Sequence, residues 1–540
     1  MRVGHNPIFR ALHRLWKAIR LTEWMVRLLG LSPSQKPDDR HGVILIQLDA
    51  LSYDRLVEAV RSGRMPFLRK LLAKQDYRLH RVYPGMPCNT PAAQARLFYG
   101  VGAAVSAFTF YDRQEGTLRW MFHPDDAHHV EARLSEQGRA LLDEGSAYSN
   151  IFTGGAREPH FCIAALGFGE MLRRPPALGY LLLVLMQVPA LVRAAAYLGL
   201  EMVLALVDCL RGIIAGHDLL RELKWIPSRV GMCVVLRELT VIGVQIDAAR
   251  GLPIIHANLM GYHEQSHRRG ADSRFARWTL GGMDGAIRRI WKRARSSSRR
   301  DYHICIYSDH GQENVIPYET AMGRSLQAAV SEACEDLCAT RGLSRRGKST
   351  FLERIGLRNP LNAIRLAVGR TPEEARVVTA TLSPMAHVYL LDTTLRKRKA
   401  DLVRTLLDRH LVPIVFEPDA PNRVIAHTAE HQWVLPDDPG PWFDRTAPYY
   451  EEMVSDFVQA CVHPDAGDLI LCGYQGPGKP YYSFTIESGS HGGIGPQETH
   501  AFVMLPADLS PDDNQAYFRH EQLRRIVLAL LDHQDGDSAS

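Results

Sequence analysis

Short apolar runs alternate with helical patterns along this chain. The run 43–48 is mostly β-branched and aliphatic, lies between turn-forming residues and is followed by Asp49, as is typical of a buried parallel strand. Similar runs occupy 254–258, 303–307, 387–391, 469–472 and 501–505, and helical patterns at 275–295 and 396–410 lie between them. This alternation predicts an α/β fold with a mainly parallel central sheet flanked by helices. In such sheets, ligands bind beyond the carboxyl ends of the strands.

Two segments interrupt this pattern. Residues 175–216 are strongly apolar, but Pro189, Arg193 and Glu201 divide them into stretches shorter than the ~20 residues that span a bilayer. The segment fits a helical hairpin in the membrane interface or over the mouth of a binding site, and the alternative is a buried helical pair in a cap domain.

The second interruption, about 318–370, reads as a helical, basic insertion without assigned chemistry. Residues 342–349 within it satisfy the P-loop pattern, yet a predicted helix precedes them where a P-loop needs a strand. We therefore reject the nucleoside triphosphate interpretation.

The amino-terminal residues 8–31 alternate basic and apolar side chains at helical spacing, and Trp16 and Trp24 lie among the positive charges. A secretory signal would need an uninterrupted apolar stretch and a cleavage site with small residues. The pattern predicts an amphipathic helix, which either contacts an anionic membrane surface or packs on the domain. Both interpretations stay open.

These features divide the chain into seven segments. We expect an amphipathic helix and linker at 1–38, a catalytic core in three parts at 39–112, 251–315 and 376–530, a helical cap with the apolar hairpin at 113–250, a basic helical insertion at 316–375, and a tail at 531–540.

Composition narrows the class of protein. With 540 residues, 46% hydrophobic and 23% charged, the chain can bury a sizeable globular core, and a net charge of +5 does not argue for nucleic-acid binding. Nine cysteines occur without a CxxC pair, so neither a zinc ribbon nor a disulfide framework is indicated. We expect reduced thiols in a cytoplasmic protein, peripheral at the inner face of the membrane if 8–31 or 175–216 contacts lipid. The oligomeric state stays open.

Carboxylates and imidazoles follow several of the predicted strands. They are Asp49, Asp309 and His310 in YSDHGQ, His263 and His267 in GYHEQSHRRG, and His491 in SGSHGG. Each alone is more often a helix cap or a hydrogen-bonded core residue. Together at one sheet edge, they are the ligands that a divalent cation requires.

The motifs LDALSYD, SDHGQ and SHGG, in this order, resemble the alkaline phosphatase superfamily, and within it the type I phosphodiesterase/nucleotide pyrophosphatase branch. The resemblance covers 42–112, 252–316, 380–395 and 465–506. It implies an alkaline-phosphatase-like fold with two divalent cations. One cation would be bound by Asp49, Thr90, Asp309 and His310, and the other by His263, His267 and His491.

The resemblance also identifies Thr90 as the nucleophile, because it stands ten positions before Gly100, the spacing found in the family. It implies a phosphothreonine intermediate that water then hydrolyses. A sulfatase is disfavoured, because Ala92 occupies the Arg position of the sulfatase pattern that would begin at Cys88. Asn89 or Gln94 is a candidate for binding the equatorial oxygens, since the Asn of the phosphodiesterase branch is replaced here by Ala93.

A second departure is His263, which stands where the family carries Asp. Either three imidazoles hold the cation, or Glu264 supplies the carboxylate, or the site is weakened and activity is reduced or lost. The imidazole count favours zinc, with manganese as the alternative. Arg268 and Arg269 could neutralise a second phosphate group, or they form an exposed basic helix start.

The sequence thus predicts a metal-dependent hydrolase of phosphoric esters, a phosphodiesterase or pyrophosphatase acting on a phosphoester substrate that is membrane-linked. The alternatives are a phosphomonoesterase or head-group phosphotransferase, and a catalytically degenerate membrane-associated binding protein.

Overall fold

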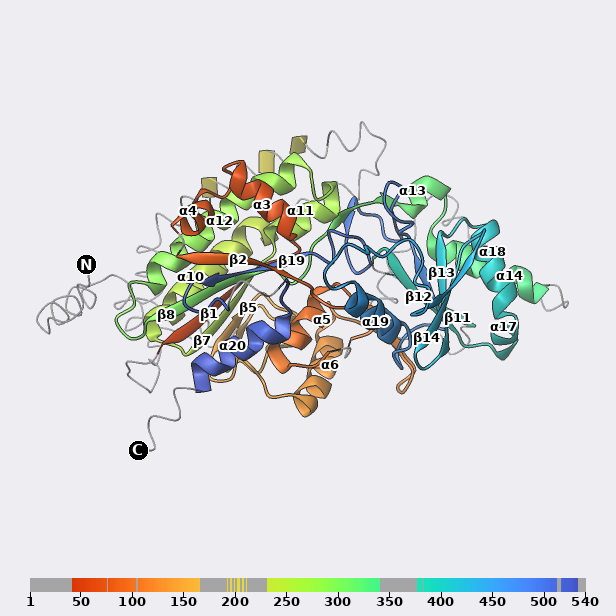
Figure 1. The fold of residues 1–540 in the computed structure, drawn as a ribbon, viewed down its shortest axis with the longest axis horizontal. Coiled ribbons are helices and arrows are strands. Elements are labelled where there is room, and N and C mark those ends of the chain that lie inside the picture. The colour runs from red at the N-terminus through yellow and green to blue at the C-terminus, as the bar shows by residue number, and fades with distance from the viewer. Residues whose placement is uncertain are drawn as a thin grey trace, which may run out of the picture.

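The computed structural model describes residues 41–74, 76–102, 105–165, 231–339, 376–381, 383–511 and 516–532, with nine helical positions between 192 and 210. A larger and a smaller sheet lie at the two ends of the long axis (Figure 1). Within the described part of the chain, no helix combines the length and the apolar character needed to cross a bilayer.

The larger sheet has seven strands in the order β2-β19-β8-β1-β7-β5-β6. Its five parallel strands are β1 (Gly42–Leu48), β5 (Ser146–Tyr148), β6 (Glu158–His160), β7 (Ile254–Leu259) and β8 (Tyr302–Tyr307). Strands β19 (Ala501–Pro506) and β2 (Tyr77–Val82) run antiparallel at one edge. The predicted α/β fold with a mainly parallel central sheet is confirmed.

Helices cover both faces of this sheet, which explains why β1 is apolar at nearly every position. Ile44 and Ile46 face a core shared with α3 (Tyr53–Arg61), α4 (Pro66–Ala73), α10 (Arg237–Arg250) and α12 (Arg274–Ala294). Val43 and Leu45 point to the opposite core, which includes the π-helical turn η1 (Ala95–Tyr99), α6 (Pro124–Gln137) and α20 (His520–Asp532). Side-chain alternation along one strand therefore fills two cores.

The smaller sheet is antiparallel and has the order β11-β12-β16-β13-β14-β15. Its strands are β11 (Val377–Thr381), β12 (Met385–Leu390), β13 (Ile414–Ala420), β14 (Arg423–His427), β15 (Gln432–Leu435) and β16 (Leu469–Cys472). Helices α14 (Leu326–Ala339), α17 (Thr393–Lys397) and α18 (Lys399–Asp408) share one of its cores, and α19 (Tyr450–Cys461) lies in the other. The expected strands 387–391 and 469–472 belong to this sheet, because an apolar run reveals burial but not the partner strand.

The structure also differs from the expected helical cap at 113–250. This range supplies β5 and β6 to the central sheet, and α10 packs beside β7 and α12. The hairpin of β3 (Thr109–Asp112) and β4 (Thr117–Trp120) spans its beginning. Short strands such as β5, with three residues, carry too little periodicity to be recognised in sequence.

Other expected parts lie partly or wholly outside the described residues. These are the amino-terminal segment 1–38, most of the apolar segment 175–216, and residues 340–375 of the insertion, which include the P-loop pattern. The described start of the insertion contains α13 (Tyr318–Met322) and α14, which pack with the smaller sheet. The expected last part of the core, 376–530, is divided between the smaller sheet and the β19–α20 edge of the larger one.

Two short strand pairs connect the halves of the molecule. Strand β9 (Glu313–Asn314) pairs with β18 (Gly489–Ser490), and β10 (Ile316–Pro317) pairs with β17 (Tyr482–Ser483). The remaining short helical elements are η2 (Ile163–Ala165), η4 (Gly231–Leu236), α5 (Thr90–Gln94) and α11 (Gly261–Arg269). The β9–β18 pair brings the glycine-rich segment around His491 to the residues that follow β8.

Candidate active site

The carboxyl ends of β8, β1 and β7, which are neighbours in the sheet, carry most of the candidate ligands. Asp49 follows β1, Asp309 and His310 follow β8, and α11 after β7 carries His263 and His267. Because the three strands are parallel, these side chains meet at one edge, as predicted. Thr90 begins α5, and His491 directly follows β18.

The ligand atoms of Asp49, Asp309 and His310 form the first cluster and lie within 4.8 Å of one another. Asp49 Oδ1 and Asp309 Oδ2 are buried and have no hydrogen-bond partner among the described residues. Burial, and then the charge of Asp309, raises the pKa of Asp49 well above its usual range. Two buried carboxylates facing each other are costly without a compensating charge, so this pair fits a divalent cation.

The other oxygen of each carboxylate is held by a hydrogen bond. Asn258 Nδ2 donates to Asp49 Oδ2 at 2.7 Å, and the backbone N–H of Ala50 donates to Asp309 Oδ1 at 3.1 Å. One oxygen of each pair is therefore oriented by the protein, and the other is left for a ligand.

Thr90 stands beside the first cluster, with its Oγ1 3.3 Å from His310 Nε2. His310 Nδ1 donates to the Gly311 carbonyl at 2.8 Å, which leaves the lone pair on Nε2 in the neutral ring. Asn89 caps α5, because its Oδ1 accepts a hydrogen bond from Ala92 N at 2.9 Å. The cap fixes the start of the helix and therefore the position of the Thr90 hydroxyl.

The second cluster consists of His263, His267 and His491. His263 Nε2 lies 3.0 Å from His491 Nε2 and 2.8 Å from His267 Nε2. Burial, followed by the neighbouring imidazoles, lowers the pKa of both His263 and His491 well below the usual value. Converging imidazole nitrogens are a donor set suited to a divalent cation, so the three residues fit a metal site.

The outer nitrogens of two rings are anchored. His267 Nδ1 lies 2.7 Å from Glu487 Oε2, and His491 Nδ1 lies 3.2 Å from the Cys88 carbonyl. Burial disfavours the charged form of His267, but Glu487 outweighs it and raises the His267 pKa. Carboxylate–imidazole pairs of this kind orient metal-binding histidines. Glu264, the alternative carboxylate, lines the same cavity but is outside the cluster.

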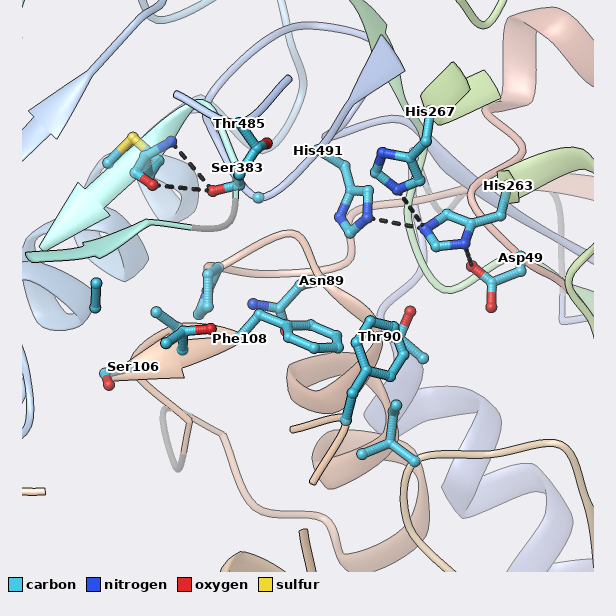
Figure 2. Close-up of a pocket in the computed structure, with 18 of the residues that line it drawn as sticks. Asp49, Asn89, Thr90, Ser106, Phe108, His263, His267, Ser383, Thr485 and His491 are labelled. Carbon is cyan, nitrogen blue, oxygen red and sulfur yellow. Dashed lines mark hydrogen bonds and ion pairs between the residues drawn. The ribbon is translucent and has the colours of Figure 1, made fainter. Parts of the chain in front are cut away.

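The two clusters adjoin, and Figure 2 shows Asp49 of the first cluster beside His263 of the second. His263 Nδ1 lies 3.9 Å from Asp49 Oδ1, and the rings of His310 and His491 stack with centroids 4.1 Å apart. The two clusters would hold two cations near the Thr90 hydroxyl, where they would supply Lewis-acid chemistry.

Two residues predicted to bind substrate, Gln94 and Arg268, do not line the cavity at the candidate site. Gln94 Oε1 accepts hydrogen bonds from the backbone N–H groups of Ile151 and Phe152, each at 3.1 Å, and so anchors the loop after β5. Arg268 is buried, and neither it nor Arg269 is among the described residues that line the cavity at the centre. The direction in which a helical side chain points depends on the packing of its helix, which the sequence alone does not specify, and neither Gln94 nor Arg268 lines the cavity. Asn89, the other candidate for this role, lines the cavity.

Three functional candidates are not evident from the sequence. Asn258 and Glu487 hold candidate metal-binding side chains in place, Asn258 that of Asp49 and Glu487 that of His267. Asn150 lines the cavity, and both of its amide atoms are buried without a hydrogen-bond partner among the described residues. Of the three, only Asn258 could have been singled out from the sequence, because it is a polar residue in an apolar strand. Asn150 and Glu487 lie in loops whose course depends on the tertiary fold.

Comparison with known proteins gives structural matches only, since no protein-family model and no curated protein matches this chain. Human ectonucleotide pyrophosphatase/phosphodiesterase 5 is 9% identical with a TM-score of 0.47, covering 91% of this chain and 95% of its own. The murine protein in complex with AMP is 10% identical with a TM-score of 0.45, covering 91% and 95%. Phosphonoacetate hydrolase from Sinorhizobium meliloti 1021 with phosphonoformate is 14% identical with a TM-score of 0.41, covering 92% and 98%. The resemblance of this chain to the alkaline phosphatase superfamily rests on its motifs and on the two clusters that those motifs form.

Proposed function

We propose that this chain is a metal-dependent hydrolase of phosphoric esters that uses Thr90 as its nucleophile and two divalent cations. The observation that carries the proposal is the position of the Thr90 hydroxyl beside His310, where a carboxylate cluster and an imidazole cluster adjoin. Each residue type alone is common. A buried hydroxyl beside two adjoining sets of candidate metal ligands is an arrangement suited to displacement at phosphorus.

The residues present fit zinc, with manganese as the alternative, because three imidazoles favour the softer ion. When bound, such cations act as Lewis acids that lower the pKa of the Thr90 hydroxyl and neutralise the phosphoryl oxygens. The convergence of the three Nε2 atoms favours a preserved second site over a disabled one at His263.

The chemistry of Thr90 follows from its position. Its Oγ1 loses its proton and attacks phosphorus, the bond from phosphorus to the leaving oxygen breaks, and the leaving group takes up a proton to depart as an alcohol or phosphate. Water then cleaves the bond between phosphorus and Oγ1 of the phosphothreonine, which releases the remaining phosphate ester and restores the hydroxyl. Asn89, whose Oδ1 is used as the helix cap, presents its amide to the cavity and is proposed to donate to an equatorial oxygen.

Charge favours a diester or pyrophosphate over a monoester. The described residues that line the cavity include neither Lys nor Arg, whereas Glu264 and Glu487 add acidic groups beside the clusters. A monoester dianion would bring more negative charge to this site than a diester monoanion.

Membrane contact through 8–31 and 175–216 is part of the proposal. It is supported by the described helical positions between 192 and 210, where Val192, Val203 and Leu210 are exposed. Loss of liposome binding after deletion of residues 1–35 would support a role for the first segment, and unchanged binding would exclude it.

The proposal is tested by metal content and hydrolysis together. Elemental analysis should find about two cations per chain, and bis-para-nitrophenyl phosphate should be hydrolysed faster than para-nitrophenyl phosphate. Thr90→Ala should abolish turnover and keep the fold. Thr279→Ala, which removes a buried threonine hydroxyl from α12, should change neither. One cation or none, without turnover, would favour the degenerate binding protein.

A further inference from the structure

A cavity of about 650 Å³ extends from the two clusters of candidate metal ligands into the space between the two sheets. Its size is that of a pocket for a ligand much larger than phosphate. Residues from both halves of the molecule line it, including Ile151 after β5, Phe457 on α19 and Ile470 on β16. Figure 2 shows the histidines at one side, with Ser106 and Ser383 across the pocket from them.

The two ends of the cavity differ in polarity. All the carboxylates of its described lining, Asp49, Glu264 and Glu487, lie at or beside the clusters. The remaining wall is largely apolar and aromatic, with Phe108, Phe122, Phe161 and Phe457. Phe108 and Phe122 pack together with ring centroids 4.7 Å apart. Phe122 is 40% exposed, so this aromatic pair continues from the cavity to the molecular surface.

Two serine hydroxyl groups in this wall are already used by the protein. Ser106 donates its proton to the Asp465 carbonyl, and Ser383 donates to the Met385 carbonyl and accepts from the Met385 N–H. A hydroxyl has one proton to donate, so neither serine is left to donate to a base or a sugar. A polar body placed here would find few free partners in the described lining to replace its hydrogen bonds to water, the amide of Asn150 being one.

We propose that this cavity binds the hydrocarbon body of a lipid phosphodiester, so that one phosphate lies at the metal clusters and an uncharged apolar chain lies against the aromatic wall. The inference rests on the proposed hydrolase function and adds the class of substrate. Further phosphate groups are disfavoured because the described lining has no Lys or Arg to neutralise them. Removal of hydrocarbon from water supplies the affinity.

The test is a series of para-nitrophenyl phosphodiesters that share one leaving group and one charge and differ only in the second ester, namely methyl, butyl and octyl, used below the concentration at which they aggregate. The para-nitrophenyl ester of thymidine 5′-monophosphate is the nucleotide comparison. We expect kcat/KM to rise about twofold to fourfold per methylene, with the thymidine ester no better than the methyl ester. A rate independent of chain length, or a preference for thymidine, would overturn the inference and leave the hydrolase function standing.

Variants locate the effect in the cavity. Phe108→Ala and the exposed Phe122→Ala should lower kcat/KM for the octyl ester about tenfold or more and leave the methyl ester nearly unchanged. Leu239→Ala, a half-exposed residue of α10 outside the described lining, should affect neither ester. An equal loss of kcat/KM for both esters would show that the two phenylalanines stabilise the fold and do not bind the hydrocarbon chain of the substrate.

A binding measurement separates this inference from catalysis. Titration calorimetry of the Thr90→Ala protein with octyl methyl phosphate should give affinity at least about tenfold above that for thymidine methyl phosphate, with a negative heat-capacity change. If the wild type hydrolyses no ester but this preference is found, the hydrolase proposal fails and the lipid site stands. If no preference is found, the lipid site fails.

Discussion

The hydroxyl oxygen of Thr90 lies 3.3 Å from Nε2 of His310, although 220 positions separate the two residues along the chain. The contact joins the start of α5 to the end of β8, and both residues are buried. If His310 binds a cation as proposed, the hydroxyl held against its imidazole can approach the same cation, where the proton of the proposed nucleophile would be most easily lost.

Replacement of Thr90 by Ser should retain activity within about tenfold, because the hydroxyl remains and only a methyl group is lost. Acid quenching of the wild type during turnover should leave a phosphorylated peptide that contains residue 90. Mass spectrometry of the digest checks both proteins, since the phosphoryl adduct, with the second ester group still attached, should lie on the serine at position 90 in the variant. A phosphate found on another residue would exclude Thr90 as the nucleophile.

His263→Ala should lower the metal content from about two cations per chain to about one, because a zinc site rarely survives on two protein ligands. His263→Asp restores the carboxylate found in the family and should keep both cations. Elemental analysis of the dialysed proteins measures the difference. Unchanged metal content in His263→Ala would mean that the imidazole cluster is not a metal site.

Asp49→Asn should have opposite effects on stability with and without metal. In the chelated protein it removes one of two facing buried carboxylates and should raise the free energy of unfolding by about 1–3 kcal/mol. In the metal-loaded protein it removes a ligand and should lower Tm. Thermal unfolding with and without a chelator tests whether the effect of the substitution on Tm changes sign between the two states. A decrease in both states would show that Asp49 stabilises the fold in another way.

Glu487→Gln should weaken metal binding about tenfold to a hundredfold while the fold is kept, because the His267 ring loses the carboxylate that orients it. The 2.7 Å contact between His267 Nδ1 and Glu487 Oε2 is the basis for this expectation. Competition with a chromogenic zinc chelator gives the affinity. Glu452→Gln, on the exposed side of α19, is the matched control and should bind zinc as the wild type does.

Asn150→Ala should separate activity from stability. Both amide atoms of Asn150 are buried and have no hydrogen-bond partner among the described residues, so removing them should raise the free energy of unfolding by about 1 kcal/mol. If the amide serves the substrate in the adjoining cavity, kcat/KM should fall in the same protein. Urea unfolding measures the stability and hydrolysis rates measure the activity of the variant. A stabilised variant with full activity would exclude a role of Asn150 in substrate binding.

The amino-acid sequence by itself determined the parts of the site that depend on local pattern. An apolar run followed by Asp49 specifies a buried strand with a candidate metal ligand at its end, and the same holds for Asp309 and His310 after β8. Because parallel strands end at the same edge, these residues had to converge in a fold of this class. The spacing between Thr90 and Gly100 is likewise a local feature, and through the family resemblance it identifies the candidate nucleophile.

The tertiary structure alone decided where long-range contacts form. Burial of residues 387–391 and 469–472 is evident from their apolar side chains, but their pairing in the antiparallel sheet is not, since periodicity reports the environment of a strand and not its partner. Gln94 anchors a loop, and Arg268 lies outside the described cavity lining, because packing decides which way a helical side chain points. The apolar cavity exists only where two separately encoded sheets meet, so no local pattern could have predicted it.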